Sequence, residues 1–232
     1  MTSKSIQQYI TSYFDREGIE AKEGRKERSS DNSSKPQKNS PSMVLMSWNA
    51  NTIQNKRREL ECYLIDNNVD VCAIQELDTD ITKLKRDMEY GHTLIWSDER
   101  PQPRFGFIMK RNIAIRASHR ATTYFAVEFD MNGKDVTLFN YYRDNRLASH
   151  IWKEELEALG RQAAELNRQG KVVLIAGDVN AHSSLWSDSE NDAGTYFSDW
   201  LDTHQLVCLN SIYAPGVATS LQLRRPNKTF VH

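Results

Sequence analysis

Four short apolar runs of this chain end in polar side chains, and this pattern limits the possible folds more than any other feature. The runs and the polar residues at their ends are 44–46 with Asn49 and Asn51, 69–75 with Glu76, 136–142 with Tyr142 and Arg143, and 171–177 with Asp178, Asn180 and His182. Apolar runs of this length, bounded by polar residues, are typical of buried strands. The polar side chains therefore mark strand ends.

Helical patterns alternate with these runs. Apolar residues recur every three or four positions from Trp152 to Leu166, which predicts a helix that begins near Ser149 and stops at Gly170. Two weaker helices are predicted at 56–68 and 195–203. Further predicted strands are 93–96, 105–110, 124–130, 206–210 and 229–231, with hairpin turn residues at 131–134. Strands interleaved with helices predict an α/β protein with mixed sheets.

The first 42 residues differ from the rest of the chain. From 21 to 42 the sequence holds no apolar side chain large enough to anchor it, so ordering it would cost more entropy than burial could offset. We expect residues 1–42 to be a disordered polar tail. Residues 43–232 are predicted to form one domain.

Composition excludes several classes of protein. Lys and Arg total 30 and Asp and Glu total 31, so any affinity for nucleic acid must come from a local patch or a bound cation. No apolar run is long enough to span a membrane, and the first residues lack the apolar core of a signal peptide. We expect an intracellular protein, of the nucleus or cytoplasm, that makes no membrane contact. The three cysteines lie in apolar surroundings without metal-site spacing, which predicts reduced core residues.

The polar strand ends carry a coherent chemistry. In open α/β sheets, ligands gather outside the carboxyl ends of the strands. Glu76 and Asp178 are hard oxygen donors of the kind that hold Mg²⁺ or Mn²⁺ beside a phosphate. Asn49 and Asn180 can orient a carboxylate or a water, and Tyr142 can donate to a phosphate oxygen. The set suits metal-assisted hydrolysis of a phosphodiester.

Each position also has a structural interpretation. The asparagines could be turn residues, Glu76 a solvated strand end, Tyr142 an edge aromatic, and Gly177-Asp178 a plain turn.

Four segments resemble the endonuclease/exonuclease/phosphatase superfamily: SWNAN at 47–51, CAIQE at 72–76, FNYYRDN at 139–145 and GDVNAHSSLW at 177–186. Within it, Trp186, Gly194, the FSDWLDTHQLVCLN stretch and the closing TFVH are most similar to the endonuclease domain of non-LTR retrotransposons. The similarity covers roughly 43–232. It implies a DNase-like four-layer α/β/β/α sandwich of two mixed sheets and the nicking of DNA, whose 3′ hydroxyl then primes the element's reverse transcriptase.

The resemblance also implies roles for single residues. Glu76 would bind the cation, with Asn49 in support. Tyr142 would contact the scissile phosphate, Asp178 would position the attacking water, and Asn180 would hold the phosphate or that water. Asn51 would be a supporting residue, and His182 would hold its loop through hydrogen bonds. Arg143 is a candidate contact to the DNA backbone.

One part of the family pattern is missing. Members continue beyond the TFVH-like string with a strand carrying an Asp and then a Ser-Asp-His motif, and this chain contains no Asp-His dipeptide. The nearest imitation, Asp202-Thr203-His204, falls at a predicted helix end. We therefore expect a truncated domain that lacks its last strands and has little hydrolytic activity alone.

Two alternatives stay open. The chain could be a phosphatase or lipid phosphodiesterase of the same superfamily, or a non-catalytic remnant that binds nucleic acid or a partner protein. Candidate phosphate contacts outside the site are Lys110-Arg111, Arg116, Arg120 and Arg224-Arg225, although solvated surface is the ordinary interpretation of each.

Overall fold

The structure is a computed structural model, and it describes residues 43–80, 82, 88, 90–97, 102–187 and 189–213. The predicted tail at 1–42 and the predicted strand at 229–231 lie outside these residues. In chain order the described elements are β1 (Leu45–Asn49), α1 (Arg57–Asp66), β2 (Val71–Gln75), β3 (His92–Trp96), β4 (Phe105–Lys110), β5 (Ile115–Arg120), β6 (Tyr124–Met131), β7 (Lys134–Tyr142), α2 (Ser149–Arg168), β8 (Val172–Asp178), α3 (Asp192–Thr203) and α4 (Leu209–Tyr213).

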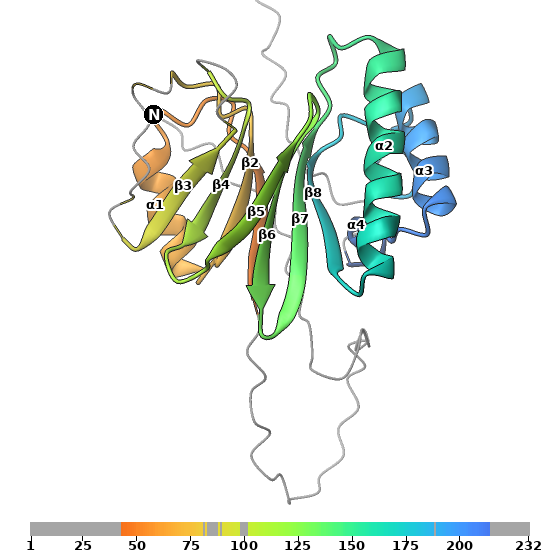
Figure 1. Ribbon diagram of the computed structural model, residues 1–232. Coiled ribbons are helices and arrows are strands. Elements are labelled where there is room, and N and C mark those ends of the chain that lie inside the picture. Colours follow the sequence, from red (N-terminus) through yellow and green to blue (C-terminus); the bar gives the residue numbers. More distant parts are fainter. Residues whose placement is uncertain are drawn as a thin grey trace, which may run out of the picture.

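The strands form two mixed sheets that pack face to face. One has the order β1-β2-β4-β3 and the other β5-β6-β7-β8. Each contains one parallel pair, β1 with β2 and β7 with β8, and two antiparallel pairs. Buried apolar side chains fill the space between the sheets, among them Phe107, Phe125, Phe129 and Leu138. The sandwich in the middle of Figure 1 is therefore held by an apolar core.

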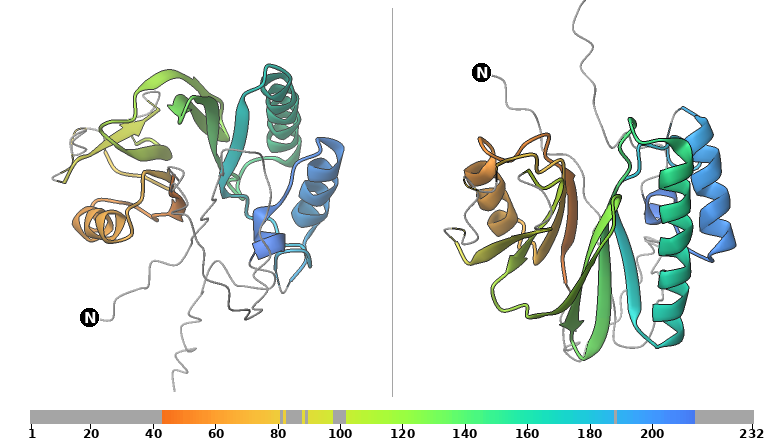
Figure 2. Two further views of the ribbon diagram at one scale, coloured as in Figure 1. Left: turned by 90° about the horizontal axis from the view of Figure 1, so that it is seen from below. Right: turned by 45° about the horizontal axis from the view of Figure 1, so that its top comes forward.

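Helices cover the two outer faces. Leu60 and Leu64 of α1 pack on the first sheet, and Leu156 and Leu159 of α2 pack on the second. α3 lies beside α2 on that same side, and the view from below separates the layers (Figure 2). The arrangement is helix, sheet, sheet, helix, which confirms the predicted α/β fold of two mixed sheets.

The long helix and the hairpin follow the sequence pattern closely. The recurring apolar residues of α2 all point inward: Trp152, Leu156, Leu159, Ala163 and Leu166 are buried. Between β6 and β7 the chain turns at Asn132 and Gly133, which both have positive φ, at 55° and 81°. Such a pair at the tip of a two-residue hairpin matches the right-handed twist of the strands.

The sequence analysis missed one strand and predicted another that is absent. No strand was predicted at 115–120, where β5 lies at the edge of the second sheet. The strand predicted at 206–210 is absent. α3 ends at Thr203, Gln205 just beyond it has φ of 54°, and the short helix α4 begins at Leu209. Leu206 caps α3 instead, because its N–H donates to the carbonyl of Leu201 at 2.9 Å.

None of the helices in the described part of the chain is long and apolar enough to cross a membrane. The cysteine prediction was correct only in part. Cys72 is buried, and burial raises the pKa of its thiol well above its usual range. Cys208 is partly buried and Cys62 is exposed, so Cys62 is not a core residue.

Candidate active site

The polar ends of β1, β2, β7 and β8 meet at one edge of the sandwich. Asn49 Nδ2 lies 3.0 Å from Glu76 Oε1 and 2.9 Å from Asp178 Oδ2, so one amide group contacts both carboxylates. The hydroxyl of Tyr142 donates to Glu76 Oε1 at 2.7 Å. Side chains separated by up to 129 positions in the sequence are thus hydrogen-bonded neighbours. The structure brings together four of the residues selected from the sequence.

The topology explains this convergence. The parallel pair β1–β2 sets Asn49 opposite Gln75, one residue before Glu76. The parallel pair β7–β8 sets Tyr142 opposite Asp178. Because parallel strands end at the same edge of a sheet, both pairs deliver their polar residues together. Each sheet supplies half of the site, and β1 lies against β8 across the sandwich.

The backbone around Glu76 is strained. Glu76 has φ of 49°, in the left-handed region that costs a non-glycine residue about 1–2 kcal/mol. Its carbonyl accepts from the Thr52 N–H at 2.8 Å, and Thr52 is itself left-handed, with φ of 65°. The loop after β1 therefore runs alongside the residues after β2 and holds Glu76 in this conformation.

Asn51 lies on that loop but outside the group of carboxylates. Its N–H donates to Asn49 Oδ1 at 3.1 Å, which orients the Asn49 amide so that Nδ2 faces Glu76 and Asp178. The side chain of Lys56 contacts the carbonyl oxygens of Ala50 and Asn51. The contacts of Asn51 are those of a supporting residue.

Tyr142 is held between a carboxylate and a cation. Its pKa lies well above the usual range, because of burial and of the hydrogen bond to Glu76. The guanidinium of Arg104 lies 4.8 Å from the centre of its ring. At neutral pH the phenol is therefore protonated and can donate a hydrogen bond.

Arg104 and Asp144 were missed by the sequence reasoning. Arg104 Nη1 contacts Asp144 Oδ2, and Arg146 Nη2 reaches the same oxygen at 3.0 Å. Hydrogen bonds from Arg146, with further contributions from Arg104, hold the pKa of Asp144 well below its usual range. Their positions in the sequence could have identified them, because Asp144 stands two residues after Tyr142 and Arg104 directly precedes a predicted strand.

The turn after β8 is shaped by its own side chains. Gly177 has φ of 147°, and a β-carbon there would lie 1.8 Å from the carbonyl oxygen of Tyr141. The N–H of Asn180 donates to Asp178 Oδ1 at 3.0 Å. Asn180 is left-handed, with φ of 46°, and its Nδ2 donates to the carbonyl of Arg143 at 2.7 Å.

Arg143 is turned toward this same loop. Its Nε donates to the carbonyl of Val179 at 3.0 Å and its Nη2 to that of Asn180 at 2.5 Å. The guanidinium lies 5.1 Å from the ring centre of Trp152, which is buried on α2. Two of its three nitrogens are engaged by the protein.

His182 holds the loop that follows. Its Nδ1 lies 3.2 Å from the hydroxyl oxygen of Ser187, and its N–H donates to Asn191 Oδ1 at 3.1 Å. A β-carbon on Gly194 would lie 1.8 Å from the His182 carbonyl oxygen, so a glycine is needed where α3 meets this loop. These contacts tie His182 to the segment from Ser187 to Asn191.

A buried polar network lies beneath the site. Gln75 Nε2 donates to Asn140 Oδ1 at 2.6 Å, and Asn140 Nδ2 donates to the carbonyls of Ile74 and Gly106, both at 2.8 Å. Gln75 and Asn140 are fully buried and belong to different sheets. Hydrogen bonds between them therefore fix one sheet against the other directly under Glu76 and Tyr142.

The donor set fits a hard divalent cation bound mainly through water. No group of three or more His, Cys, Asp or Glu side chains that could hold a metal occurs within the described ranges. Mg²⁺ is commonly held by one or two carboxylates, keeping several waters. Glu76 and Asp178 supply two carboxylates, and no described residue donates a hydrogen bond to Glu76 Oε2.

The histidine nearest to the family's missing motif lies elsewhere. His204 Nε2 is 3.2 Å from Glu157 Oε2 on α2, and its ring packs so closely on α2 that a β-carbon on Gly160 would lie 2.4 Å from it. Among the described residues, no histidine is hydrogen-bonded to Glu76, Asp178, Asn49 or Tyr142. His204 therefore serves the contact between α2 and α3.

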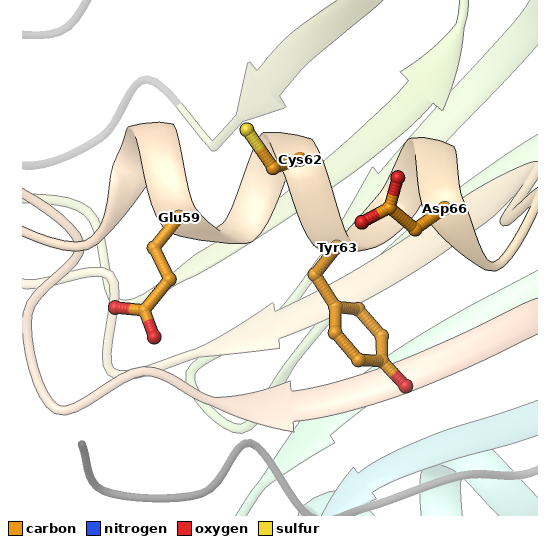
Figure 3. Close-up of a pocket in the computed structure, with 4 residues that line it drawn as sticks. All are labelled: Glu59, Cys62, Tyr63 and Asp66. Atoms are coloured by element: carbon orange, nitrogen blue, oxygen red, sulfur yellow. The ribbon is translucent and has the colours of Figure 1, made fainter.

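A separate hollow lies on the surface of α1. Glu59, Cys62, Tyr63 and Asp66 line it (Figure 3). It shares no residue with the group formed by Asn49, Glu76, Tyr142 and Asp178, so it plays no part in the site.

Comparison with known proteins supports the fold. Residues 136–224 match the family model described as endonuclease-reverse transcriptase. The endonuclease domain of TRAS1, a telomere-specific non-LTR retrotransposon, is 15% identical with a TM-score of 0.53, over 69% of this chain and 71% of that one. No curated protein matches the sequence.

Two further solved structures have the same TM-score. An AP endonuclease from Archaeoglobus fulgidus is 14% identical with a TM-score of 0.53, over 68% of this chain and 70% of that one. The 3'-5' exonuclease from Neisseria meningitidis is 19% identical with the same TM-score and coverage. The chain thus has the endonuclease/exonuclease/phosphatase fold, and its residues 136–224 match the endonuclease-reverse transcriptase family.

Proposed function

We propose that this chain is a metal-dependent DNA endonuclease domain of the non-LTR retrotransposon type, which hydrolyses one phosphodiester and nicks DNA. The observation that carries the proposal is the contact of Asn49 with both Glu76 and Asp178 at distances of 3.0 and 2.9 Å. Two carboxylates from different sheets would repel each other strongly unless a donor or a cation lay between them. Such an arrangement suits a site that binds a cation beside a phosphate.

Each residue of the site has a separate role in the proposed hydrolysis. Glu76, with Asn49 in support, would hold Mg²⁺ or Mn²⁺, and that cation would neutralise charge on the phosphate. Asp178 Oδ1 accepts the N–H of Asn180, which fixes the carboxylate for orienting a water. Tyr142 is protonated at neutral pH, and its hydroxyl, which donates to Glu76 Oε1 in this structure, would donate to a non-bridging phosphate oxygen when substrate is bound. Asn180 would hold the phosphate or the water.

DNA is the proposed substrate, and the reverse transcriptase of the same element is the proposed partner if the reading frame continues. The family description includes a reverse transcriptase, and the similar TRAS1 domain comes from a retrotransposon. A nick with a free 3′ hydroxyl would serve as primer.

We expect hydrolysis by residues 1–232 alone to be slow, because this sequence lacks the Ser-Asp-His string that the resemblance implies. Loss of a triad-type histidine costs several orders of magnitude in rate. A segment carrying that string, added in trans, should raise the rate.

The test is nicking of supercoiled plasmid under excess protein, with Mg²⁺ or Mn²⁺ and with chelator. We expect slow, cation-dependent nicking that falls at least ~100-fold in Glu76→Gln and in Asp178→Asn, because each loses a carboxylate at the reacting phosphate. Glu59→Gln, an exposed carboxylate on α1, is the matched control and should retain the wild-type rate.

Other outcomes would replace the proposal. Release of phosphate from small esters without plasmid nicking would indicate a phosphatase or lipid phosphodiesterase. Retention of DNA without cation-dependent cleavage, even with the added segment, would indicate a non-catalytic binding protein.

A further inference from the structure

We propose that Arg143 is a positioning residue, which ties the end of β7 to the turn at 178–180 and so holds Asp178 and Asn180 in place for catalysis. The inference rests on the proposed function. A basic residue beside a nuclease site would ordinarily be assigned to the DNA backbone, and the structure gives its guanidinium a different use.

The link between Arg143 and the turn has four hydrogen bonds. The Arg143 N–H donates to the carbonyl of Asp178 at 3.0 Å. Its Nε and Nη2 donate to the carbonyls of Val179 and Asn180. In return, the Asn180 side chain donates to the carbonyl of Arg143. The two segments are therefore bonded in both directions, through backbone and side chain.

The turn needs such support. Asn180 is left-handed, with φ of 46°, a conformation that asparagine adopts more readily than most residues and that nearby hydrogen bonds hold in place. Three consecutive carbonyls, of residues 178 to 180, accept from Arg143. Without these donors the three carbonyls would accept hydrogen bonds from water instead, and the turn would lose its fixed conformation.

The guanidinium is also fixed from the other side. It lies 5.1 Å from the ring centre of Trp152, which is only 4% exposed. Trp152 lies near the start of α2, which packs on the outer face of the second sheet (Figure 1). A planar cation between an aromatic ring and backbone carbonyls is restricted in orientation. α2 thus supports the turn through Arg143.

Arginine is needed here rather than any cation. The fork of a guanidinium can reach two neighbouring carbonyls while stacking on an aromatic ring, whereas an ammonium is a point charge that cannot do both. A DNA phosphate can be bound by a lysine as well as by an arginine, whereas this pair of carbonyls and the ring cannot be contacted together by a lysine. Arg143→Lys therefore separates a phosphate contact from support of the turn. Lysine should preserve a phosphate contact but should not hold the turn at 178–180.

The experiment compares Arg143→Ala and Arg143→Lys with wild type in three measurements. These are amide exchange at Asn180, DNA affinity by fluorescence anisotropy across a salt series, and the single-turnover nicking rate. For alanine we expect exchange at least ~10-fold faster, a nicking rate at least ~10-fold lower, and DNA affinity within ~2-fold with an unchanged salt slope. For Arg143→Lys we also expect faster exchange at Asn180 and slower nicking than in wild type, with unchanged DNA affinity.

Lys153→Ala is the matched control. Lys153 Nζ lies 5.6 Å from the centre of the same Trp152 ring, and within the described part of the chain it forms no hydrogen bond with residues 178–180. Removing it should leave exchange and rate unchanged.

Two results would overturn the inference. One is weaker DNA binding in Arg143→Ala with a salt slope lower by about 1 and unchanged exchange at Asn180, which identifies a phosphate contact. The other is no change in any measurement. If wild type fails to nick DNA even with the added segment, the proposed function fails, and the exchange data at Asn180 still decide whether Arg143 holds the turn.

Discussion

At the scale of single residues, the site stores backbone strain where its chemistry is placed. Glu76, Asn180 and Asn51 all have positive φ, at 49°, 46° and 42°. Left-handed residues that are not glycine cluster at functional sites, where the surrounding structure enforces them. Their side-chain types could be identified from the sequence. Their conformations could not, because they depend on partners such as Thr52 and Arg143 that lie far away in the chain.

Gly177 gives a prediction at this scale. Gly177→Ala should lower the free energy of unfolding by at least ~3 kcal/mol, since an unfavourable φ adds to the overlap of the new β-carbon with the Tyr141 carbonyl. Gly170→Ala is the control, because Gly170 also has positive φ, at 78°, but open space around it. We expect Gly170→Ala to cost about 1–2 kcal/mol, from the unfavourable φ alone. Urea unfolding measures both, and equal costs would contradict the steric argument.

At the scale of elements, hydrophobic pattern determined most of what the sequence could predict. The buried strands and the one-sided helix α2 are continuous apolar signals, and both were predicted correctly. β5 was missed because its residues alternate between partly buried and exposed, with arginines at both its second and last positions. The apolar stretch at 206–210 imitated a strand, but no partner strand is available to it among the described residues.

The alignment of the two sheets against each other could not be predicted from local sequence. Gln75 and Asn140 are 65 positions apart, and nothing in either local sequence indicates that their amides meet. Each was interpreted only as part of a strand or a motif. The candidate site residues were found because strand ends share an edge, whereas the network beneath them depends on how two separate sheets align.

A double-mutant cycle tests this network. Gln75→Leu should cost about 1–3 kcal/mol, because it leaves Asn140 Oδ1 buried without a donor. Combined with Asn140→Leu, the loss should be smaller than the sum of the two single losses by about 1 kcal/mol. Urea unfolding of the four proteins gives the coupling.

Thr137→Val is the matched control for the cycle. Thr137 is fully buried on β7, and its hydroxyl has no hydrogen-bond partner among the described residues. Removing that hydroxyl should be neutral or slightly stabilising. Additive losses in the cycle would mean that the amides contribute independently and do not lock the sheets.

At the scale of the whole molecule, different contacts hold the two ends of the second sheet. The site end is joined through Arg143 and the buried amides. At the other end Glu128 on β6 accepts from Lys171 at 2.8 Å and lies 2.9 Å from His119 on β5. These contacts, the one with Lys171 foremost, lower the pKa of Glu128. In this network Glu128 links β5 and β6 to Lys171, the residue directly before β8.

This network predicts an acid-dependent loss of stability. Because the pKa of Glu128 is lowered in the folded state, its contribution is complete above the ordinary value of 4.5 and is lost as pH falls through the lowered value. Glu128→Gln should therefore be less stable than wild type at pH 7, and the difference should shrink below about pH 4.5. Thermal unfolding from pH 7 to 3 measures it, and parallel curves would refute the linkage.

The division of the site between two sheets has a thermodynamic consequence. Glu76 belongs to one sheet and Asp178 to the other, so any ligand that contacts both carboxylates lies across the boundary between the two sheets. Such a ligand binds the assembled chain and has no equivalent partner in the unfolded one. By mass action it must raise the melting temperature in proportion to the logarithm of its concentration, whether or not any bond is ever cleaved.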